Sequence, residues 1–128
     1  MDADGQNTVK ASRNDDLWLG SPAWSHDGKR LAYVGMRRNR QGGGRIYVEA
    51  LGEASEPQDL GPGEAPCWSP DGKRIVFWFH QGGQERLHVL EFDSGAPPQL
   101  LPGQVTKRNS DPAWSPDGKQ IAFASDRP

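Results

Sequence analysis

Pro66-Cys-Trp-Ser-Pro-Asp-Gly-Lys-Arg-Ile-Val-Phe77 is the stretch of sequence that decides the fold, because close copies of it occur three times. The copy at Pro22 is Pro-Ala-Trp-Ser-His-Asp-Gly-Lys-Arg-Leu-Ala-Tyr, and the copy at Pro112 is Pro-Ala-Trp-Ser-Pro-Asp-Gly-Lys-Gln-Ile-Ala-Phe. The repeat period is about 45 residues, with turn residues inside each unit and no helical pattern. This combination predicts four-stranded β-propeller blades and disfavours solenoids built from helix pairs.

Each unit contains a turn followed by a strand that is apolar on both faces. In the second unit Ser-Pro-Asp-Gly at 69–72 is typical of a tight turn: proline presets φ, aspartate bonds the local backbone and glycine takes a positive φ. Along residues 75–79 the apolar side chains fall on both sides of a period-two pattern. We therefore expect a sheet that is packed between two neighbouring blades.

The next hairpin fixes the expected register. If residues 82–83, both glycine, form a two-residue turn, Phe77 lies opposite His88, and the equivalent pair of the first unit is Tyr33 opposite Tyr47. Prolines near the fourth strands fit outer edge strands. The third strands are expected at 45–51 and 86–92, and the fourth strands at 57–60 and 98–101.

The composition agrees with this fold class. The 128 residues include 16 Gly, 11 Pro and five Trp, as expected for many short strands joined by turns around an aromatic core. We predict an all-β propeller of four-stranded antiparallel blades, with about three blades, half a ring, in one domain. Its expected parts are an N-terminal closing strand and lead-in loop (1–20), blade 1 (21–63), blade 2 (64–109) and a partial blade 3 (110–128).

The repeat resembles that of the TolB-like six-bladed propellers. The resemblance rests on Pro-Ala-Trp-Ser-Pro-Asp-Gly-Lys-x-Ile-Ala-Phe, on Ser125-Asp126-Arg127 after it and on Ile46-Tyr47-Val48, and it covers residues 20–128. Similar repeats build the propellers of prolyl-oligopeptidase-type and tricorn-type proteases. The resemblance implies a non-catalytic propeller that joins protein partners in the bacterial periplasm, with its channel mouth as the usual ligand or metal position.

Three blades do not close a ring, since closed propellers need four to eight. One hypothesis is that two chains pair about a two-fold axis as a homodimer, with residues 7–12 of one chain completing the last blade of the other. The alternative is that the chain is a fragment of a longer propeller. Exposed blade faces and strand edges would favour association in either case.

Charged residues suggest a binding face. Basic side chains crowd the loop between the second and third strands of the first unit and the approach to the third unit, which predicts recognition of an acidic peptide or carboxylate. The alternative is a solvated arginine-rich hairpin. The candidate ligand-binding residues are Arg37, Arg38, Arg40, Lys107, Arg108 and Asp111. Arg45 belongs to the same loop, Ser21 and Ala65 are expected beside the channel with Asp111, and Glu49, Glu53, Glu56 and Asp59 are expected towards the opposite face.

The repeated aromatic side chains have the same place in every unit, which indicates packing between blades and not ligand binding. Trp78 takes the place of Val34 and Ala124 and either fills a wider gap or forms a contact surface. The residues expected to pack blades together are Trp24, Trp68, Trp114, Tyr33, Phe77 and Phe123.

Several functions are disfavoured. A net charge of −2 argues against nucleic-acid binding, and residues 1–20 contain neither a secretory leader nor an apolar span for membrane insertion. His80 and His88 do not form a ligand pair in the expected register, so neither a metal nor a cofactor is expected. No phosphate loop, serine elbow or His-Glu-x-x-His motif occurs, so the chain is not expected to be an enzyme. The alternative is an accessory propeller of a peptidase or lyase, separated from its catalytic domain.

Overall fold

Strands make up all the regular structure in the described residues of the computed structural model, which are 2–6, 12, 16–39, 42–52, 54–104 and 106–126. Since none of these residues forms a helix, no helix among them could span a membrane. The strands are β1 (Leu17–Trp24), β2 (Arg30–Arg37), β3 (Arg45–Ala50), β4 (Gln58–Pro62), β5 (Glu64–Trp68), β6 (Arg74–Gln81), β7 (Gln84–Glu91), β8 (Gln99–Leu100), β9 (Asn109–Trp114) and β10 (Ile121–Ser125).

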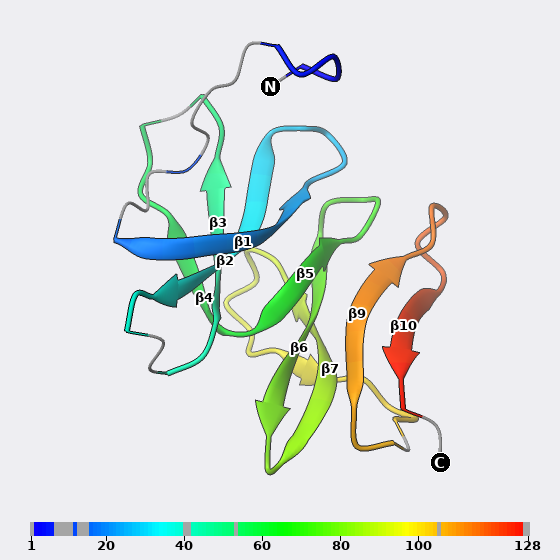
Figure 1. The fold of residues 1–128 in the computed structure, drawn as a ribbon. Helices are drawn as coiled ribbons and strands as arrows, with labels where there is room; N and C mark the ends of the chain where they lie inside the picture. The colour runs from blue at the N-terminus through cyan, green and yellow to red at the C-terminus, as the bar shows by residue number, and fades with distance from the viewer. Residues whose placement is uncertain are drawn as a thin grey trace.

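The strands form three antiparallel sheets that follow one another along the chain (Figure 1). Blade 1 is the sheet β1-β2-β3-β4, blade 2 is the sheet β5-β6-β7-β8, and blade 3 is the pair β9-β10. The first strands β1, β5 and β9 contact each other in that order, so they form the inner edge of the arc. The predicted fold class, an open part of a propeller with four-stranded blades, is confirmed.

The turn that begins each repeat has the predicted geometry. In blade 2 the Ser69 hydroxyl donates to Asp71 Oδ1 at 2.6 Å, the Lys73 amide donates to the same oxygen at 3.0 Å, and Gly72 has a φ of 69°. These two bonds hold the pKa of Asp71 below its ordinary value. The turns at 25–28 and 115–118 have the same bonds, and all three lie along the upper side of Figure 1.

The predicted register is also confirmed. Phe77 pairs with His88, and Tyr33 pairs with Tyr47. The fourth strands differ slightly from expectation: β4 continues to Pro62, and β8 contains only two residues. β1 begins at Leu17, so the first blade starts within the segment that was expected to be its lead-in loop.

The main core lies between blade 1 and blade 2. Trp68 stands on the face of blade 2 that meets blade 1 and packs edge-to-face on Phe92, with ring centroids 5.0 Å apart. The Arg30 guanidinium of blade 1 lies over the Phe92 ring, 4.8 Å from the ring centre. Small and branched side chains of blade 1 pack against larger side chains of blade 2. The buried members of this core are Ala32, Ile46, Val48, Trp68, Ile75, Phe77 and Leu90.

Candidate binding surfaces

The inner edge of each blade has a kink at the same position of the repeat. Ser21, Ala65 and Asp111 each lie three residues before the repeated tryptophan, and their φ values are 48°, 47° and 50°. The pairing of the inner strand shifts at this point in all three blades. A left-handed conformation costs a non-glycine residue roughly 1–2 kcal/mol, so surrounding contacts must hold the kink in place.

Asp111 is the acidic residue of this row. Its side chain is exposed, and its Oδ2 accepts a bond from the Ser110 hydroxyl at 2.9 Å. No group of three or more histidine, cysteine, aspartate or glutamate side chains that could hold a metal ion occurs in the described ranges. His80 pairs with Glu85 at the end of blade 2, while His88 is buried against Phe79 with ring centroids 4.3 Å apart. Burial lowers the pKa of His88, so this imidazole is neutral at pH 7.

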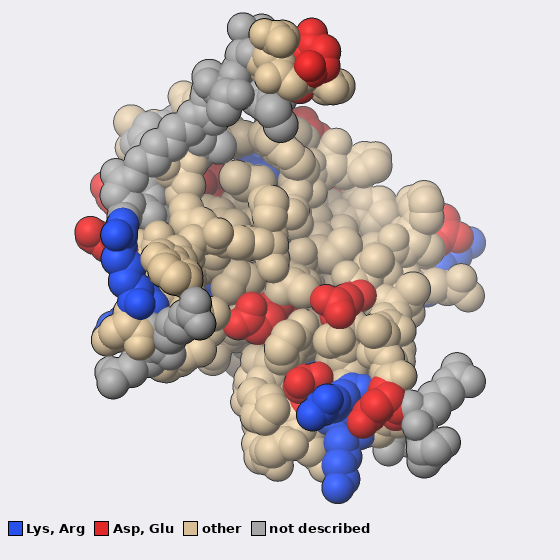
Figure 2. All heavy atoms as spheres, in the orientation of Figure 1, with Lys and Arg blue, Asp and Glu red and all other residues tan. Residues whose placement is uncertain are grey.

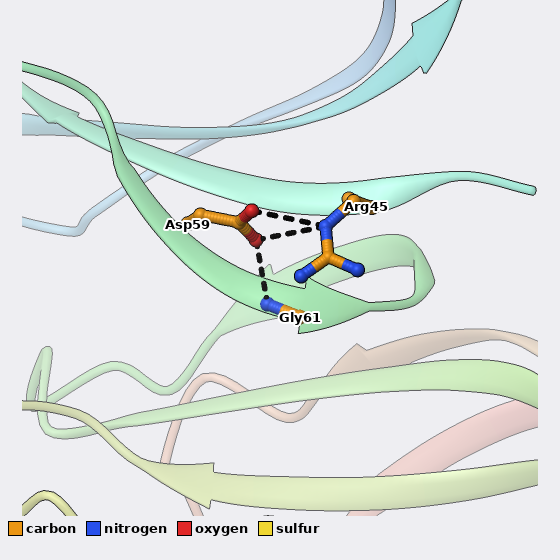
Figure 3. A network of polar contacts seen from close by, with 3 residues as sticks. All are labelled: Arg45, Asp59 and Gly61. Atoms are coloured by element: carbon orange, nitrogen blue, oxygen red, sulfur yellow. Dashed lines mark hydrogen bonds and ion pairs between the residues drawn. The ribbon is translucent and has the colours of Figure 1, made fainter. Parts of the chain in front are cut away.

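The arginine-rich loop joins β2 to β3 at the end of blade 1 opposite the Asp-Gly turn. Arg37 ends β2 and Arg38 begins the turn, and both are exposed. Arg40 lies outside the described residues. Arg45 begins β3, and its Nε donates to Asp59 Oδ2 at 2.9 Å and to Oδ1 at 3.2 Å (Figure 3).

The expected acidic cluster is wrong in two respects. Asp59 lies on β4 beside Arg45, at the basic end of the blade, where its Oδ1 also accepts a bond from the Gly61 amide at 2.9 Å. Glu49 is 3% exposed, and its carboxylate accepts bonds from Tyr33 at 2.5 Å and Ser12 at 2.9 Å. Each of these two residues therefore lies beside its own bonding partner, and the two do not form one acidic surface. Glu53 lies outside the described residues, and Glu56 is exposed.

Lys107 and Arg108 lie in the segment between β8 and β9, at the same end of the blades as the β2–β3 loop. Both side chains are exposed. Figure 1 shows the β2–β3 loop at lower left and the segment before β9 at lower right, with blade 2 between them. The two basic groups therefore share an end of the arc without forming one patch.

The segment before β9 is fixed by a polar network that sequence reasoning missed. Asn109 is 1% exposed, and its amide nitrogen donates to the carbonyls of Thr106 and Glu85. Gln104 takes the place of a neighbouring strand, since its side-chain amide accepts from the Leu87 amide at 2.7 Å and donates to the Leu87 carbonyl at 2.9 Å. The sequence signal for this network was length: the connection from β8 to β9 is longer than the connection from β4 to β5.

Arg86 completes this network. Its Nη1 donates to the carbonyls of Gln104 at 2.8 Å and Thr106 at 3.0 Å. The backbone of Lys107 takes part as well, because its carbonyl accepts from the Glu85 amide at 2.9 Å. The exposed side chains of Lys107 and Arg108 thus extend from a backbone that several hydrogen bonds hold in place.

Figure 2 shows how charge is distributed over one face of the molecule. Basic side chains lie toward the edges of this view, with acidic side chains beside them, and the middle is mostly uncharged with a few acidic side chains. This face is therefore not uniformly basic. Electrostatic attraction of an acidic partner would come from separate loops.

The repeated tryptophans lie on equivalent faces but have different neighbours. Trp68 is 5% exposed against blade 1, and Trp114 is half-buried under the Arg74 guanidinium of blade 2, 4.5 Å from the ring centre. Trp24 is 58% exposed, because it stands on the outer face of blade 1. The indole nitrogens of Trp68, Trp78 and Trp114 are buried without a hydrogen-bond partner. Tyr33 and Phe77 are buried, and Phe123 is 43% exposed.

Comparison with known proteins identifies the repeat. The family model described as the TolB beta propeller domain matches residues 1–128. The Tol-Pal system protein TolB of Alcanivorax borkumensis is 32% identical over 83 residues, which are 64% of this chain and 19% of that protein. The chain therefore spans about a fifth of the length of this curated relative.

Solved structures give the same result. TolB from Acinetobacter baumannii matches with a TM-score of 0.71 and 26% identity, over 87% of this chain and 27% of that chain. The beta-propeller domain of the Trilobed protease from Pyrococcus furiosus, which has an open velcro topology, matches with a TM-score of 0.70 over 87% and 35% of the two chains. At 18% identity this second likeness concerns the fold alone. The chain belongs to the TolB beta propeller domain family.

Proposed function

We propose that this chain is a non-catalytic binding scaffold that recognises an acidic segment of a protein partner through the loops at the basic end of its blades. The observation that carries the proposal is the anchored segment before β9. Lys107 and Arg108 extend into solvent from a backbone fixed by buried Asn109 and by Gln104. Rigid display of this kind lowers the entropy lost when a partner binds.

The curated relative named as a Tol-Pal system protein supports a role in binding proteins. Because this chain corresponds to about a fifth of that relative, the activity and partners of the whole protein, and its periplasmic location, are proposals for this chain. The kinked inner edge with Ser21, Ala65 and Asp111 is a second contact region of the same scaffold.

The binding test uses a fluorescent poly-glutamate peptide and fluorescence anisotropy at two salt concentrations. Replacing Arg37, Arg38 and Arg40 by alanine should weaken binding by about 1–3 kcal/mol at low salt, since exposed ion pairs each contribute roughly 0.2–1 kcal/mol. The matched control replaces Lys29, Lys73 and Lys119, which carry the same total charge at the Asp-Gly turns. Equal losses in both variants would reduce the effect to net charge and contradict the proposed face.

The rival function is an accessory propeller of a peptidase or lyase. A coding sequence continuous with this one that contains a serine nucleophile elbow would favour this rival, whereas neighbouring envelope-assembly components would favour the binding scaffold. For both functions, we propose that the chain is divided into a lead-in segment, two full blades and a partial blade.

Pairing of two chains into a ring is a separate proposal. In the present structure Ser12 bonds Glu49 of its own chain, and residues 7–11 lie outside the described ranges. Light scattering at several concentrations tests it. A mass twice that of the 14.1 kDa chain supports pairing, and a mass of one chain throughout contradicts it.

A further inference from the structure

Glu64 is a half-buried residue at the start of β5, and its carboxylate lies against the arginine-rich loop of blade 1. A β-carbon added at Gly44, the last residue of that loop, would overlap Glu64 Oε1. Burial raises the pKa of this carboxyl, and a hydrogen bond from the Gly44 amide opposes the rise. No ion pair of Glu64 occurs in the part of the chain that the structure describes. The carboxylate is therefore directed at a backbone amide and not at a basic side chain.

The carbonyl of Gly44 is held as well. It accepts from the Gly63 amide at 3.0 Å. Gly63 lies between the end of β4 and the start of β5, so it is the whole connection between blade 1 and blade 2. Two consecutive residues of this connection thus bond the amide and the carbonyl of Gly44. The base of the arginine-rich loop is fixed to the start of the next blade.

Blade 2 has an equivalent arrangement that uses different groups. By the register of the two hairpins, Glu85 is the counterpart of Gly44. Its amide donates to the Lys107 carbonyl at 2.9 Å, and its carbonyl accepts from the Asn109 side chain at 3.3 Å. The long connection from β8 to β9 offers a backbone carbonyl at this point, whereas the short connection from β4 to β5 does not. In the short connection the side chain of Glu64 is the acceptor.

The repeat itself does not require an acid at this position. Glu64, Gly20 and Ser110 each lie four residues before the repeated tryptophan, and neither glycine nor serine carries a carboxylate. A half-buried carboxylate without a basic partner is costly, and beside a binding site for acidic partners it weakens their attraction. What Glu64 contributes to such a site is therefore the position of the loop.

We propose that Glu64 is a positioning residue for the binding of acidic partners, because its carboxylate holds the Gly44 amide and so fixes the base of the loop that carries Arg37 and Arg38. This inference rests on the proposed binding function and names the residue that positions one of its two basic segments. A loop that is fixed before binding loses less conformational entropy when a partner binds.

The test compares Glu64→Ala with Glu64→Gln in binding of the fluorescent poly-glutamate peptide at low salt. Both changes remove the same negative charge, but only glutamine keeps an oxygen that accepts from the Gly44 amide. The alanine variant should bind about three- to tenfold more weakly than the glutamine variant, the range expected from one hydrogen bond. Equal affinities of the two variants would overturn the proposal.

Hydrogen exchange of the Gly44 amide, followed by NMR, distinguishes positioning from a general loss of stability. This amide should exchange slowly in the unmodified protein and in Glu64→Gln, and about tenfold faster in Glu64→Ala. The amide of Val76, inside the blade 2 sheet, should exchange at the same slow rate in all three proteins. If Gly44 exchanged equally fast in the unmodified protein and in Glu64→Ala, the carboxylate would not hold the loop.

Gly44→Ala tests the same contact from the other side. The added methyl group would overlap the Glu64 carboxylate and Val34 Cγ1, so this variant should bind poly-glutamate more weakly than the unmodified protein. Gly20→Ala is the matched control, because a methyl group there meets open space, and it should leave binding unchanged. A loss in the control as large as in Gly44→Ala would contradict the proposal.

The inference and the proposed function fail in distinguishable ways. If replacement of Arg37, Arg38 and Arg40 weakens poly-glutamate binding while the two Glu64 variants bind alike, the positioning role fails and the proposed function stands. If the unmodified protein does not bind poly-glutamate, the proposed function fails and the positioning role fails with it.

Discussion

Two equivalent faces of the molecule carry the same repeated residues in different environments. They are the face of blade 2 that meets blade 1 and the outer face of blade 1. In blade 2, Trp68 and Phe77 are buried by side chains of the preceding blade. In blade 1, Trp24 is 58% exposed, and Tyr33 is buried with its hydroxyl on Glu49. The repeat determines on which face of the sheet a side chain lies. The neighbouring segment determines whether that side chain is buried and so how much it contributes to stability.

The polar pair in blade 1 extends this contrast. Glu49 occupies the place of Leu90, since the former lies opposite Leu31 and the latter opposite Ile75. Ser12 also donates to the Glu49 carboxylate. At this position the outer face of blade 1 has a buried carboxylate with two hydrogen bonds, whereas the same face of blade 2 has the apolar Leu90 packed in the core.

The largest expected effect compares two tryptophans. Trp68→Ala should lower the free energy of unfolding by about 3–5 kcal/mol, because it leaves a cavity between two blades. Trp24→Ala should change it by less than about 1 kcal/mol, because that ring is mostly in solvent. Urea denaturation followed by circular dichroism measures both. Similar losses would mean that Trp24 is buried in solution.

The next effect concerns the polar pair. Tyr33→Phe should cost about 1–3 kcal/mol, since it removes a hydrogen bond to a buried carboxylate. The reverse change in blade 2, Phe77→Tyr, should also destabilise, because its hydroxyl would face the apolar Leu90 region without an acceptor. If Tyr33→Phe were stabilising, the Tyr33–Glu49 bond would not hold this face.

A smaller effect is the pH dependence of stability that His88 should cause and that Tyr47, its counterpart in blade 1, should not. Burial lowers the folded-state pKa of His88, so the unfolded chain binds a proton more readily than the folded chain. Stability should therefore be full above the unfolded pKa near 6.5 and fall as pH drops below it. His88→Phe should flatten the pH dependence of the unfolding midpoint between pH 7 and 5. An unchanged slope in this variant would assign the dependence to other groups.

The smallest effect should be the same in all three blades. Asp27, Asp71 and Asp117 have lowered pKa values from identical serine and lysine-amide bonds. Each contributes stability that is present above the unfolded pKa and is lost as pH falls through the folded pKa. Single changes to asparagine should produce small and equal shifts of the thermal midpoint near neutral pH. Unequal shifts would mean that the neighbouring blades influence the turns.

The sequence predicted those features that the repeat itself determines. The fold class, the Asp-Gly turns and the pairing of Phe77 with His88 follow from local residue types and a period of two. The network of Gln104, Arg86 and Asn109 could not be predicted, because it depends on which carbonyls a non-repeated loop brings together.

Charge pairing was the second failure, for a related reason. Arg45 and Asp59 are 14 residues apart and meet because β3 and β4 are neighbours in a register that includes a shift. Asp59 was expected towards the opposite end of the blade, because residue types alone do not show which side chains of β3 and β4 meet. Three of the candidate ligand-binding residues, Lys107, Arg108 and Asp111, are close together in the sequence. Their distance from Arg37 depends on the curvature of the whole arc, which the sequence does not show.

Hydrogen exchange of the indole N–H groups, followed by NMR, tests the central claim most directly. Each signal is assigned by a single tryptophan-to-phenylalanine change. The N–H of Trp68 should exchange slowly, because this ring is buried between blade 1 and blade 2, and the N–H of Trp24 should exchange quickly in solvent. If both exchanged at the same fast rate, the tryptophan would not join the blades and this account of the fold would be contradicted.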